Sequence, residues 1–111
     1  MTACIVGWAH TRFGKLDGET VESLVVRVAK DALDHAGIRT EDVDEILLGH
    51  FNAGFSQQDF TASLVLQADD RLRFKPATRI ENACATGSAA VRQGIRAIAS
   101  KAARTVPVVG V

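Results

Sequence analysis

The amino-acid sequence predicts an α/β fold in which strands and helices alternate and the strands form a mainly parallel sheet. Apolar residues recur with helical spacing in three segments, and four short apolar runs of strand length lie before, between and after these segments. Because short connections link the elements, we expect right-handed crossovers between parallel strands, with helices covering the sheet. Ligands are then expected at the carboxyl ends of the strands.

The first two elements are a strand and a long helix. Residues 3–7 form an apolar run that ends at a glycine and predicts a strand buried on both faces, and the polar residues 10–18 predict a loop. From Thr20 to Ala36, apolar residues follow the three- and four-residue spacing of a helix with one buried stripe. Thr20 can cap the start of this helix, and Gly37 suits a left-handed ending.

The next two elements are a strand at residues 45–49 and a second helix. One helical turn near Thr40 is expected before the strand, and residues 51–56 predict a loop. Residues 56–59 have the spacing of a capping box, which predicts a helix over residues 57–68.

The last three elements are a strand, a helix and a strand. Residues 76–81 alternate in polarity and predict the third strand, and residues 105–111 predict the fourth, in which Pro107 belongs at an edge or at a strand start. Between them, residues 85–103 predict a helix of small residues. Its apolar face carries Val91, Ile95, Ile98 and Ala102.

Composition excludes several classes of function. Hydrophobic residues make up 47% of the 111-residue chain, and 13 Lys+Arg balance 13 Asp+Glu. A nucleic-acid-binding protein would normally carry net positive charge, and the longest apolar stretches fall far short of the roughly 20 residues that span a bilayer. We therefore expect neither nucleic acid nor a membrane as a partner. No Cys or His pair has the spacing of a metal site, so no metal is expected.

Two further expectations concern the cell compartment and the extent of the chain. Cys4 and Cys84 lie far apart in a chain without an export signal, which favours free thiols and a cytoplasmic location. The chain ends on an apolar strand, so we expect a truncated single domain over residues 1–111, with exposed apolar surface and self-association.

Cys84 is the strongest candidate for a chemical role. It lies where a predicted strand ends and a helix of small residues begins, which is the outline of a nucleophile elbow. The free N–H groups and the dipole of a helix start favour a thiolate over a thiol. Gly87 and Ser88 are small enough to let a substrate approach the backbone closely. The alternative is that Cys84, between two alanines, is a small buried hydrophobic residue.

The motif Asn82-Ala83-Cys84-Ala85-Thr86-Gly87 resembles the nucleophile motif of the thiolase superfamily, in which an Asn precedes the cysteine by two positions and a small residue, Ser or Thr, and Gly follow it. Residues 5–15, 36–45 and 108–111 resemble other thiolase segments in register, so the resemblance spans nearly the whole chain. Residues 80–84 and 49–52 are most similar to the sterol-carrier-protein type of thiolase. The fold implied is thiolase-like, as an incomplete amino-terminal half.

The resemblance implies acyl transfer through a cysteine thioester, as in acetyl-CoA acetyltransferases. Cys84 would be the nucleophile, and Asn82, Gly87 and Ser88 would lie near the substrate. A coenzyme A thioester would be the substrate, no cofactor would stay bound, and the protein would act in lipid metabolism as a homodimer or homotetramer. Thiolases take their catalytic histidines and a second catalytic cysteine from a carboxyl-terminal half, so the 111-residue chain alone is expected to be inactive.

Two alternative functions remain open at this stage. One is a condensing enzyme of the β-ketoacyl synthase or hydroxymethylglutaryl-CoA synthase type, which shares the nucleophile elbow. The other is a non-catalytic thiolase-like subunit that binds acyl-CoA or serves assembly.

The remaining candidates have simpler structural interpretations. His50 follows the second predicted strand, but no acid or cysteine lies at a useful spacing, so a loop histidine is favoured over a catalytic one. His35 suits a helix end as a cation, and Cys4 is expected to be inert filler inside a strand. A basic cluster could meet the phosphates of coenzyme A or form a solvated loop balanced by nearby aspartates; its members are Arg71, Arg73, Lys75 and Arg79. By resemblance, residues 78–82 could instead pair across a dimer two-fold axis.

Overall fold

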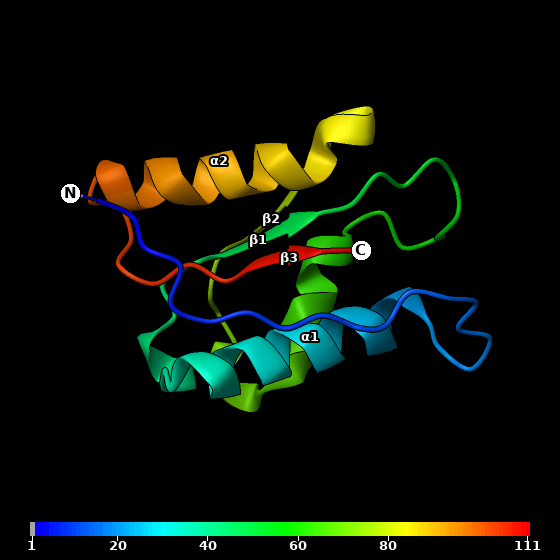
Figure 1. The fold of residues 1–111 in the computed structure, drawn as a ribbon, viewed down its shortest axis with the longest axis horizontal. Coiled ribbons are helices and arrows are strands. Elements are labelled where there is room, and N and C mark those ends of the chain that lie inside the picture. Colours follow the sequence, from blue (N-terminus) through cyan, green and yellow to red (C-terminus); the bar gives the residue numbers. More distant parts are fainter. Residues whose placement is uncertain (1) are drawn as a thin grey trace.

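In a computed structural model, which describes residues 2–111, the protein is built in three layers (Figure 1). The middle layer is a parallel sheet of three strands, in the order β2-β1-β3. Helix α2 (Thr86–Ala99) covers one face of the sheet, and α1 (Val21–Ala36) with the 3₁₀ helix Thr61–Ala68 covers the other. The strands are β1 (Ile46–Gly49), β2 (Ala77–Ile80) and β3 (Val108–Gly110). The predicted α/β class with a parallel sheet is confirmed.

The carboxyl ends of all three strands lie at one edge of the sheet. Gly49 of β1 pairs with Ile80 of β2 and with Gly110 of β3. Beyond the strands, the His50 N–H donates to the Ile80 carbonyl at 3.2 Å, and the Val111 N–H donates to the Gly49 carbonyl at 3.1 Å. The residues that follow each strand therefore start from the edge where ligands are expected.

The central strand β1 is the middle of the apolar core. All four of its residues are buried, as the apolar run predicts for a strand covered on both faces. One stripe of α1 packs toward this core through Val25, Ala29 and Leu33. Each large side chain buried in this way stabilises the fold by roughly 1.5–3 kcal/mol relative to an exposed one.

Helix α1 begins and ends as the sequence predicts. Thr20 Oγ1 accepts the Ser23 N–H at 3.0 Å, and Ser23 Oγ accepts the Thr20 N–H at 2.8 Å, so two free N–H groups are satisfied reciprocally. At the other end, Gly37 has φ 66° and its N–H donates to the Asp34 carbonyl at 3.1 Å. A left-handed residue at this position satisfies carbonyls that the helix leaves free.

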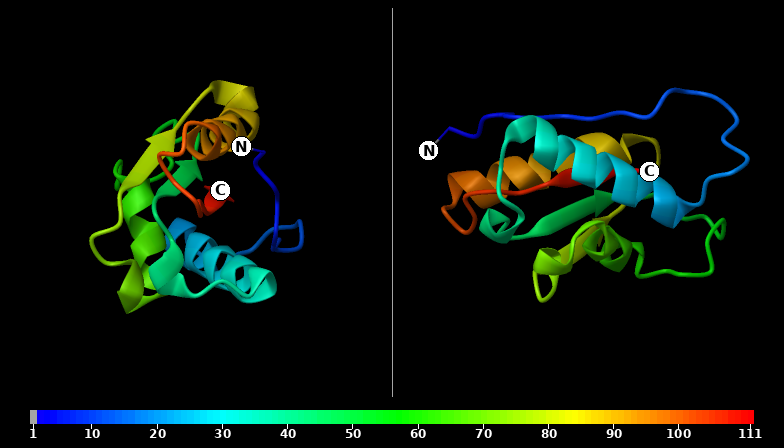
Figure 2. Two further views of the ribbon diagram at one scale, coloured as in Figure 1. Left: turned by 90° about the vertical axis from the view of Figure 1, so that its left-hand side faces the viewer. Right: turned by 90° about the horizontal axis from the view of Figure 1, so that it is seen from below.

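The predicted buried strand at residues 3–7 is wrong. This segment forms no ladder, and Ile5 and Val6 are 87% and 61% exposed. It runs along the outside of the layers, beside α1, where the Trp8 N–H donates to His35 Nδ1 at 3.1 Å (Figure 2). A helix has satisfied its own backbone groups and offers none to a neighbouring extended segment, so an apolar run is insufficient to make a strand there. Cys4 is correspondingly exposed rather than filler inside a strand.

The second helix is shorter than predicted. It begins at Thr61 instead of residue 57, and it is a 3₁₀ helix with no side-chain cap. Ser56, the expected cap, is held in a closed loop, because its N–H donates to Asn52 Oδ1 at 2.9 Å and its carbonyl accepts from Asn52 Nδ2 at 3.0 Å. Asn52 thus takes up the Ser56 N–H, which a capping box would have used, and the Ser56 carbonyl, which would have accepted the first hydrogen bond of the helix.

Helix α2 lies within the predicted residues 85–103, but it presents a different face to the sheet. Its buried residues are Thr86, Ala90 and Gly94, whereas Val91 and Ile95 of the expected apolar face are 44% and 51% exposed. The reason is steric. A Cβ built on Gly94 would lie 2.9 Å from Val108 Cγ2, and one on Gly49 would lie 3.2 Å from Ala90 Cβ.

The two edge strands are shorter than predicted. β2 occupies residues 77–80 of the expected 76–81, and β3 occupies residues 108–110 of the expected 105–111. Pro107 directly precedes β3, where it uses only its carbonyl, which accepts the Leu47 N–H at 3.0 Å. The prediction for this proline is therefore confirmed.

Exposed apolar surface is extensive, as the sequence predicts. All five phenylalanines and Trp8 are exposed, and the core consists of aliphatic side chains. No helix in the described part of the chain is long and apolar enough to cross a membrane.

Candidate active site at the turn before α2

The candidate nucleophile Cys84 lies on an exposed turn between β2 and α2, at the carboxyl edge of the sheet. The turn is a single 3₁₀ turn, Ala83–Ala85, which leads directly into the first residue of α2. Cys84 is exposed, so the interpretation of this residue as a buried hydrophobic side chain is wrong. The strand, sharp turn and helix that define a nucleophile elbow are all present at this position.

The backbone at the turn is strained. Ala83 has φ 44°, a left-handed conformation that costs a residue with a Cβ roughly 1–2 kcal/mol. Non-glycine residues keep such a conformation only where their surroundings hold it. Here the surroundings are hydrogen bonds to both polar groups of Ala83.

Two side chains supply those hydrogen bonds. Glu81 Oε2 accepts the Ala83 N–H at 2.8 Å, and Thr86 Oγ1 donates to the Ala83 carbonyl at 2.6 Å. Thr86 Oγ1 also accepts the Asn82 N–H at 2.8 Å, and the Ala85 N–H donates to the Asn82 carbonyl at 2.8 Å. Neither Thr86 nor Glu81 is predicted from the sequence to hold the turn, and Thr86 appears there only as a member of the cysteine motif. The signal that could have revealed Thr86 is a hydroxyl residue in the first turn of a helix directly after a predicted elbow.

The other predicted site residues lie on the same exposed segment as Cys84, between the end of β2 and the first turn of α2. Asn82 precedes the turn, and Gly87 and Ser88 lie in the first turn of α2; all three are exposed. A Cβ built on Gly87 would meet no atom within 4 Å, so this side of the helix start is open. The fold therefore brings together the four residues that the sequence selected.

His50 lies at the same edge of the sheet, but in a structural environment. It is buried, and its Nδ1 lies 3.0 Å from Thr61 Oγ1. Burial, and secondarily the positive charge of Arg79, hold the pKa of His50 below its usual value, while the Asp59 carboxylate acts in the opposite direction. These contacts agree with the expectation of a loop histidine.

The basic cluster is paired within the chain to a large extent. Arg71 forms ion pairs with Asp69 and Glu41, and the side-chain and backbone hydrogen bonds from Arg71 to Asp69 hold the pKa of Asp69 well below its usual range. The Arg79 guanidinium donates to the His50 carbonyl at 3.1 Å, and Lys75 Nζ donates to the Glu41 carbonyl at 3.0 Å. These contacts favour the interpretation of the basic cluster as a charge-balanced surface over its interpretation as a phosphate site. Glu41 is a partner of the cluster that the sequence did not indicate.

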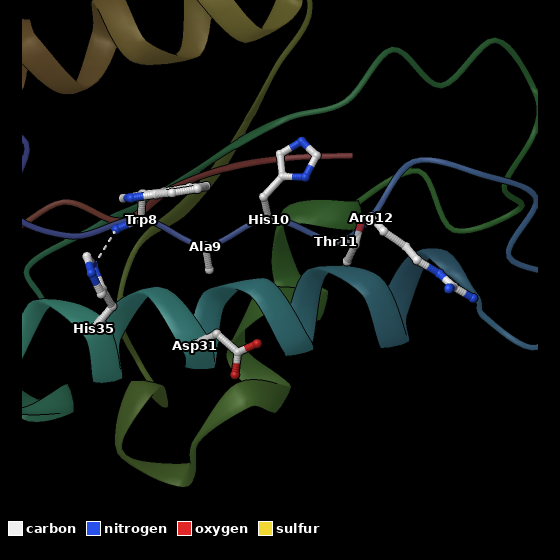
Figure 3. Close-up of a pocket in the computed structure, with 7 residues that line it drawn as sticks. All are labelled: Trp8, Ala9, His10, Thr11, Arg12, Asp31 and His35. Carbon is white, nitrogen blue, oxygen red and sulfur yellow. Dashed lines mark hydrogen bonds between the residues drawn. The ribbon is translucent and has the colours of Figure 1, made fainter.

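A separate hollow lies between the N-terminal segment and α1 (Figure 3). It is lined by Trp8, Ala9, His10, Thr11, Arg12, Asp31 and His35. The side chains of His10, Arg12 and Asp31 point in different directions and do not converge on a common point. His35 lies in the last turn of α1, where the sequence places it, and its Nδ1 accepts the Trp8 N–H at 3.1 Å. In residues 2–111, no group of three or more His, Cys, Asp and Glu side chains is placed to share a metal ion.

Comparison with known proteins agrees with the fold and with the family that the sequence resembles. The family described as "Thiolase, N-terminal domain" matches residues 3–111, and the chain belongs to this family. An acetyl-CoA acetyltransferase of Methanocaldococcus jannaschii is 41% identical over 108 residues, which are 96% of this chain and 27% of that protein. The chain thus spans about a quarter of the length of this relative.

Two solved structures show the same architecture. The acetyl-CoA acetyltransferase from Syntrophomonas wolfei superposes with a TM-score of 0.79 over 94% of this chain and 27% of that one, at 20% identity, a level that establishes the fold alone. The 3-oxoacyl-[acyl-carrier-protein] synthase III from Aquifex aeolicus VF5 superposes with a TM-score of 0.67 over 89% of this chain and 31% of that one, at 30% identity.

Proposed function

We propose that this chain supplies the nucleophile of an acyl-CoA acyltransferase of the thiolase type. The observation that carries the proposal is the exposure of Cys84 on a strained turn between a parallel strand and a helix start, in a chain of the thiolase N-terminal domain family. The first half-reaction is acyl transfer to Cys84. In the condensing direction, the acyl group comes from an acyl-CoA, and the second half-reaction is condensation with another acyl-CoA. In the degradative direction, Cys84 attacks the 3-keto carbonyl of a 3-ketoacyl-CoA, the carbon–carbon bond breaks, acetyl-CoA leaves after protonation, and the acyl group then passes to coenzyme A.

The first half-reaction requires a thiolate at an accessible carbonyl. The Cys84 sulfur attacks the carbonyl carbon of an acyl-CoA thioester, the carbon–sulfur bond to coenzyme A breaks, and coenzyme A leaves as a thiolate that takes up a proton. The acyl group remains as a thioester on Cys84. We assign Asn82, Gly87 and Ser88 to the side of the turn where the substrate lies. The open space in front of Gly87 supports this assignment.

The second half-reaction requires an acid and a base. His50, the buried histidine at this edge, is hydrogen-bonded to Thr61 and is not assigned this task. In thiolases, which the chain resembles, histidines and a second cysteine of the carboxyl-terminal half supply the acid and the base. The chain spans only 27% of the length of its Methanocaldococcus relative. We therefore expect the 111-residue polypeptide alone to release no coenzyme A from acetoacetyl-CoA at steady state; sustained release would overturn this expectation.

A second candidate is a condensing enzyme of the β-ketoacyl synthase type. The 30% identity to a 3-oxoacyl-[acyl-carrier-protein] synthase III favours it. Both candidates load an acyl group on Cys84, and they differ in the second substrate. Acyl-enzyme that is discharged by acyl-carrier-protein thioesters and not by acyl-CoA would indicate the synthase.

The direct test is mass spectrometry after incubation of the full-length protein with acetyl-CoA. We expect an acetyl group on Cys84, which the variant Cys84→Ala loses and the matched variant Cys4→Ala retains. Both cysteines are exposed, so nonspecific acylation would mark Cys4 as well. An unmodified Cys84 in the full-length protein would contradict the acyltransferase and favour a non-catalytic acyl-CoA-binding subunit.

The proposal extends to assembly, pathway and location. We propose a homodimer or homotetramer, because β2 is an edge strand whose outer side has no partner within residues 2–111. The two free thiols support a cytoplasmic location. An acyl-CoA substrate supports a place in lipid metabolism, with no resident cofactor. Sedimentation of the full-length protein tests the assembly, since a monomer at micromolar concentration would contradict it.

A further inference from the structure

We propose that Thr86 is a positioning residue for Cys84, and that its hydroxyl fixes the turn in the conformation that presents the sulfur to the acyl donor. This inference rests on the proposed function for its chemical consequence. The hydrogen bonds that carry it are features of the fold itself.

The hydroxyl of Thr86 joins backbone groups of the two residues that precede Cys84. Oγ1 accepts the Asn82 N–H at 2.8 Å and donates its own proton to the Ala83 carbonyl at 2.6 Å. A hydroxyl can do both at once because it has one donor and two acceptor sites. Val or Ala at this position could do neither, whereas Ser could do both.

Thr86 is itself fixed by packing. It is 7% exposed, and it faces the end of β1, where a Cβ built on Gly49 would lie 3.3 Å from both Thr86 Cγ2 and the Thr86 carbonyl oxygen. The hydroxyl therefore ties the turn to the sheet. By contrast, the Glu81 side chain that accepts the Ala83 N–H is exposed and can move more freely.

The position of Cys84 depends on the conformation held in this way. Ala83, the residue before it, has φ 44°, which the chain would leave if the hydrogen bonds to Asn82 and Ala83 were lost. Rotation at Ala83 would swing Cys84 relative to the start of α2. Displacement of a reacting group by about 1 Å can reduce a rate by about a hundredfold.

The test compares Thr86→Val, which keeps the shape and removes the hydroxyl, with Thr86→Ser, which keeps the hydroxyl. Both variants are made in the full-length protein with Cys4→Ala, and the modification of Cys84 is measured on the peptide that contains it. Hydrogen exchange of the Asn82 amide reports the bond directly. We expect exchange to quicken about tenfold in Thr86→Val and to stay near wild type in Thr86→Ser.

The second readout is the rate of acetyl transfer from acetyl-CoA to Cys84, compared with its alkylation by iodoacetamide. We expect acetyl transfer to fall by at least about tenfold in Thr86→Val, while alkylation, which needs no docked substrate, changes by less than about twofold. Thr86→Ser should restore acetyl transfer. A purely structural role would lower the melting temperature without separating the two rates.

The outcomes that decide the proposal are distinct. Unchanged Asn82 exchange or unchanged acetyl transfer in Thr86→Val would overturn it. If wild-type Cys84 is never acetylated, the proposed function fails. Hydrogen exchange of the Asn82 amide then still tests whether the Thr86 hydroxyl accepts this N–H. If Thr86→Val does not fold, Glu81→Ala and its control Glu81→Gln probe the same turn from an exposed position, and equal acetyl transfer in these two variants and wild type would overturn the role of the held turn.

Discussion

The contact between Gly49 and the start of α2 provides the sharpest test of how the fold positions Cys84. A Cβ on Gly49 would lie 3.2 Å from Ala90 Cβ and 3.3 Å from Thr86 Cγ2, so Gly49→Ala requires a shift of a few tenths of an ångström between β1 and α2. Overpacking of this kind costs about 1–3 kcal/mol, and the lower entropy of the unfolded alanine chain offsets about 0.4–1 kcal/mol of it. We expect a net loss of about 1 kcal/mol, which lowers the melting temperature by about 5 °C.

Gly94→Ala is the matched control for this variant. A Cβ there would lie 2.9 Å from Val108 Cγ2, a similar intrusion between α2 and the sheet, but at a distance of two turns from Thr86 along the helix. Both variants should therefore lose comparable stability. Only Gly49→Ala should slow acetyl transfer to Cys84, by about fourfold if a shift of about 0.3 Å scales from a hundredfold loss per 1 Å.

Thermal unfolding followed by circular dichroism, together with mass spectrometry of the acetylated cysteine, measures both quantities. A Gly49→Ala protein as stable as wild type would show that β1 and α2 are not in close contact at this point. Equal rates of acetyl transfer in the two variants would refute the argument that this contact positions the turn.

Three further predictions concern stability. Thr20→Ala removes one half of the capping box and should lower the free energy of unfolding by about 1 kcal/mol in urea titrations, whereas Thr20→Ser should be near wild type; equal loss in both would contradict the role of the hydroxyl. Gly37→Ala places a Cβ at φ 66° and should cost roughly 1–2 kcal/mol in the same titration; a stabilised variant would show that the left-handed ending is not maintained. Because the pKa of His50 is lowered in the folded protein, the unfolded chain binds a proton more readily, so the stability that neutral His50 contributes is intact above about pH 6.5 and is lost as the pH falls below it. The melting temperature should therefore drop less between about pH 7.5 and 5.5 in His50→Gln than in wild type. An equal drop in the two proteins would show that His50 does not cause the acid destabilisation.

The sequence predicts those elements whose cause is local. The capping residues of α1 lie within four positions of one another, and the buried strand β1 is marked by an unbroken apolar run, so both were found. The position of Cys84 between a strand and a helix follows from the same local patterns. The exposure of Cys84 rules out its interpretation as a buried hydrophobic residue, and this exposure is visible only in the structure.

The predictions that failed depend on competing contacts that hydrophobic periodicity does not show. Residues 3–7 have the composition of a buried strand, but whether they pair depends on which backbone groups lie beside them, and the segment lies along α1 instead. The start of the second helix failed because Asn52 binds the backbone of Ser56 across a loop. Neither competing contact leaves a periodic signal in the sequence.

The wrong face predicted for α2 follows from a more general property of close packing. Hydrophobic periodicity assigns the large apolar side chains to the interior, and on that basis Val91 and Ile95 should have faced the sheet. The structure buries Thr86, Ala90 and Gly94 instead, because a helix can come close to a strand only where both surfaces are small. Cys84 lies two residues before the first residue of α2, so the same close approach that leaves the larger side chains outside also sets the distance between the candidate nucleophile and the carboxyl edge of the sheet. Small residues at Gly49 and Ala90, beside the start of α2, are therefore expected to matter for acyl transfer as well as for stability, whereas Gly94, two turns further along, is expected to matter for stability alone.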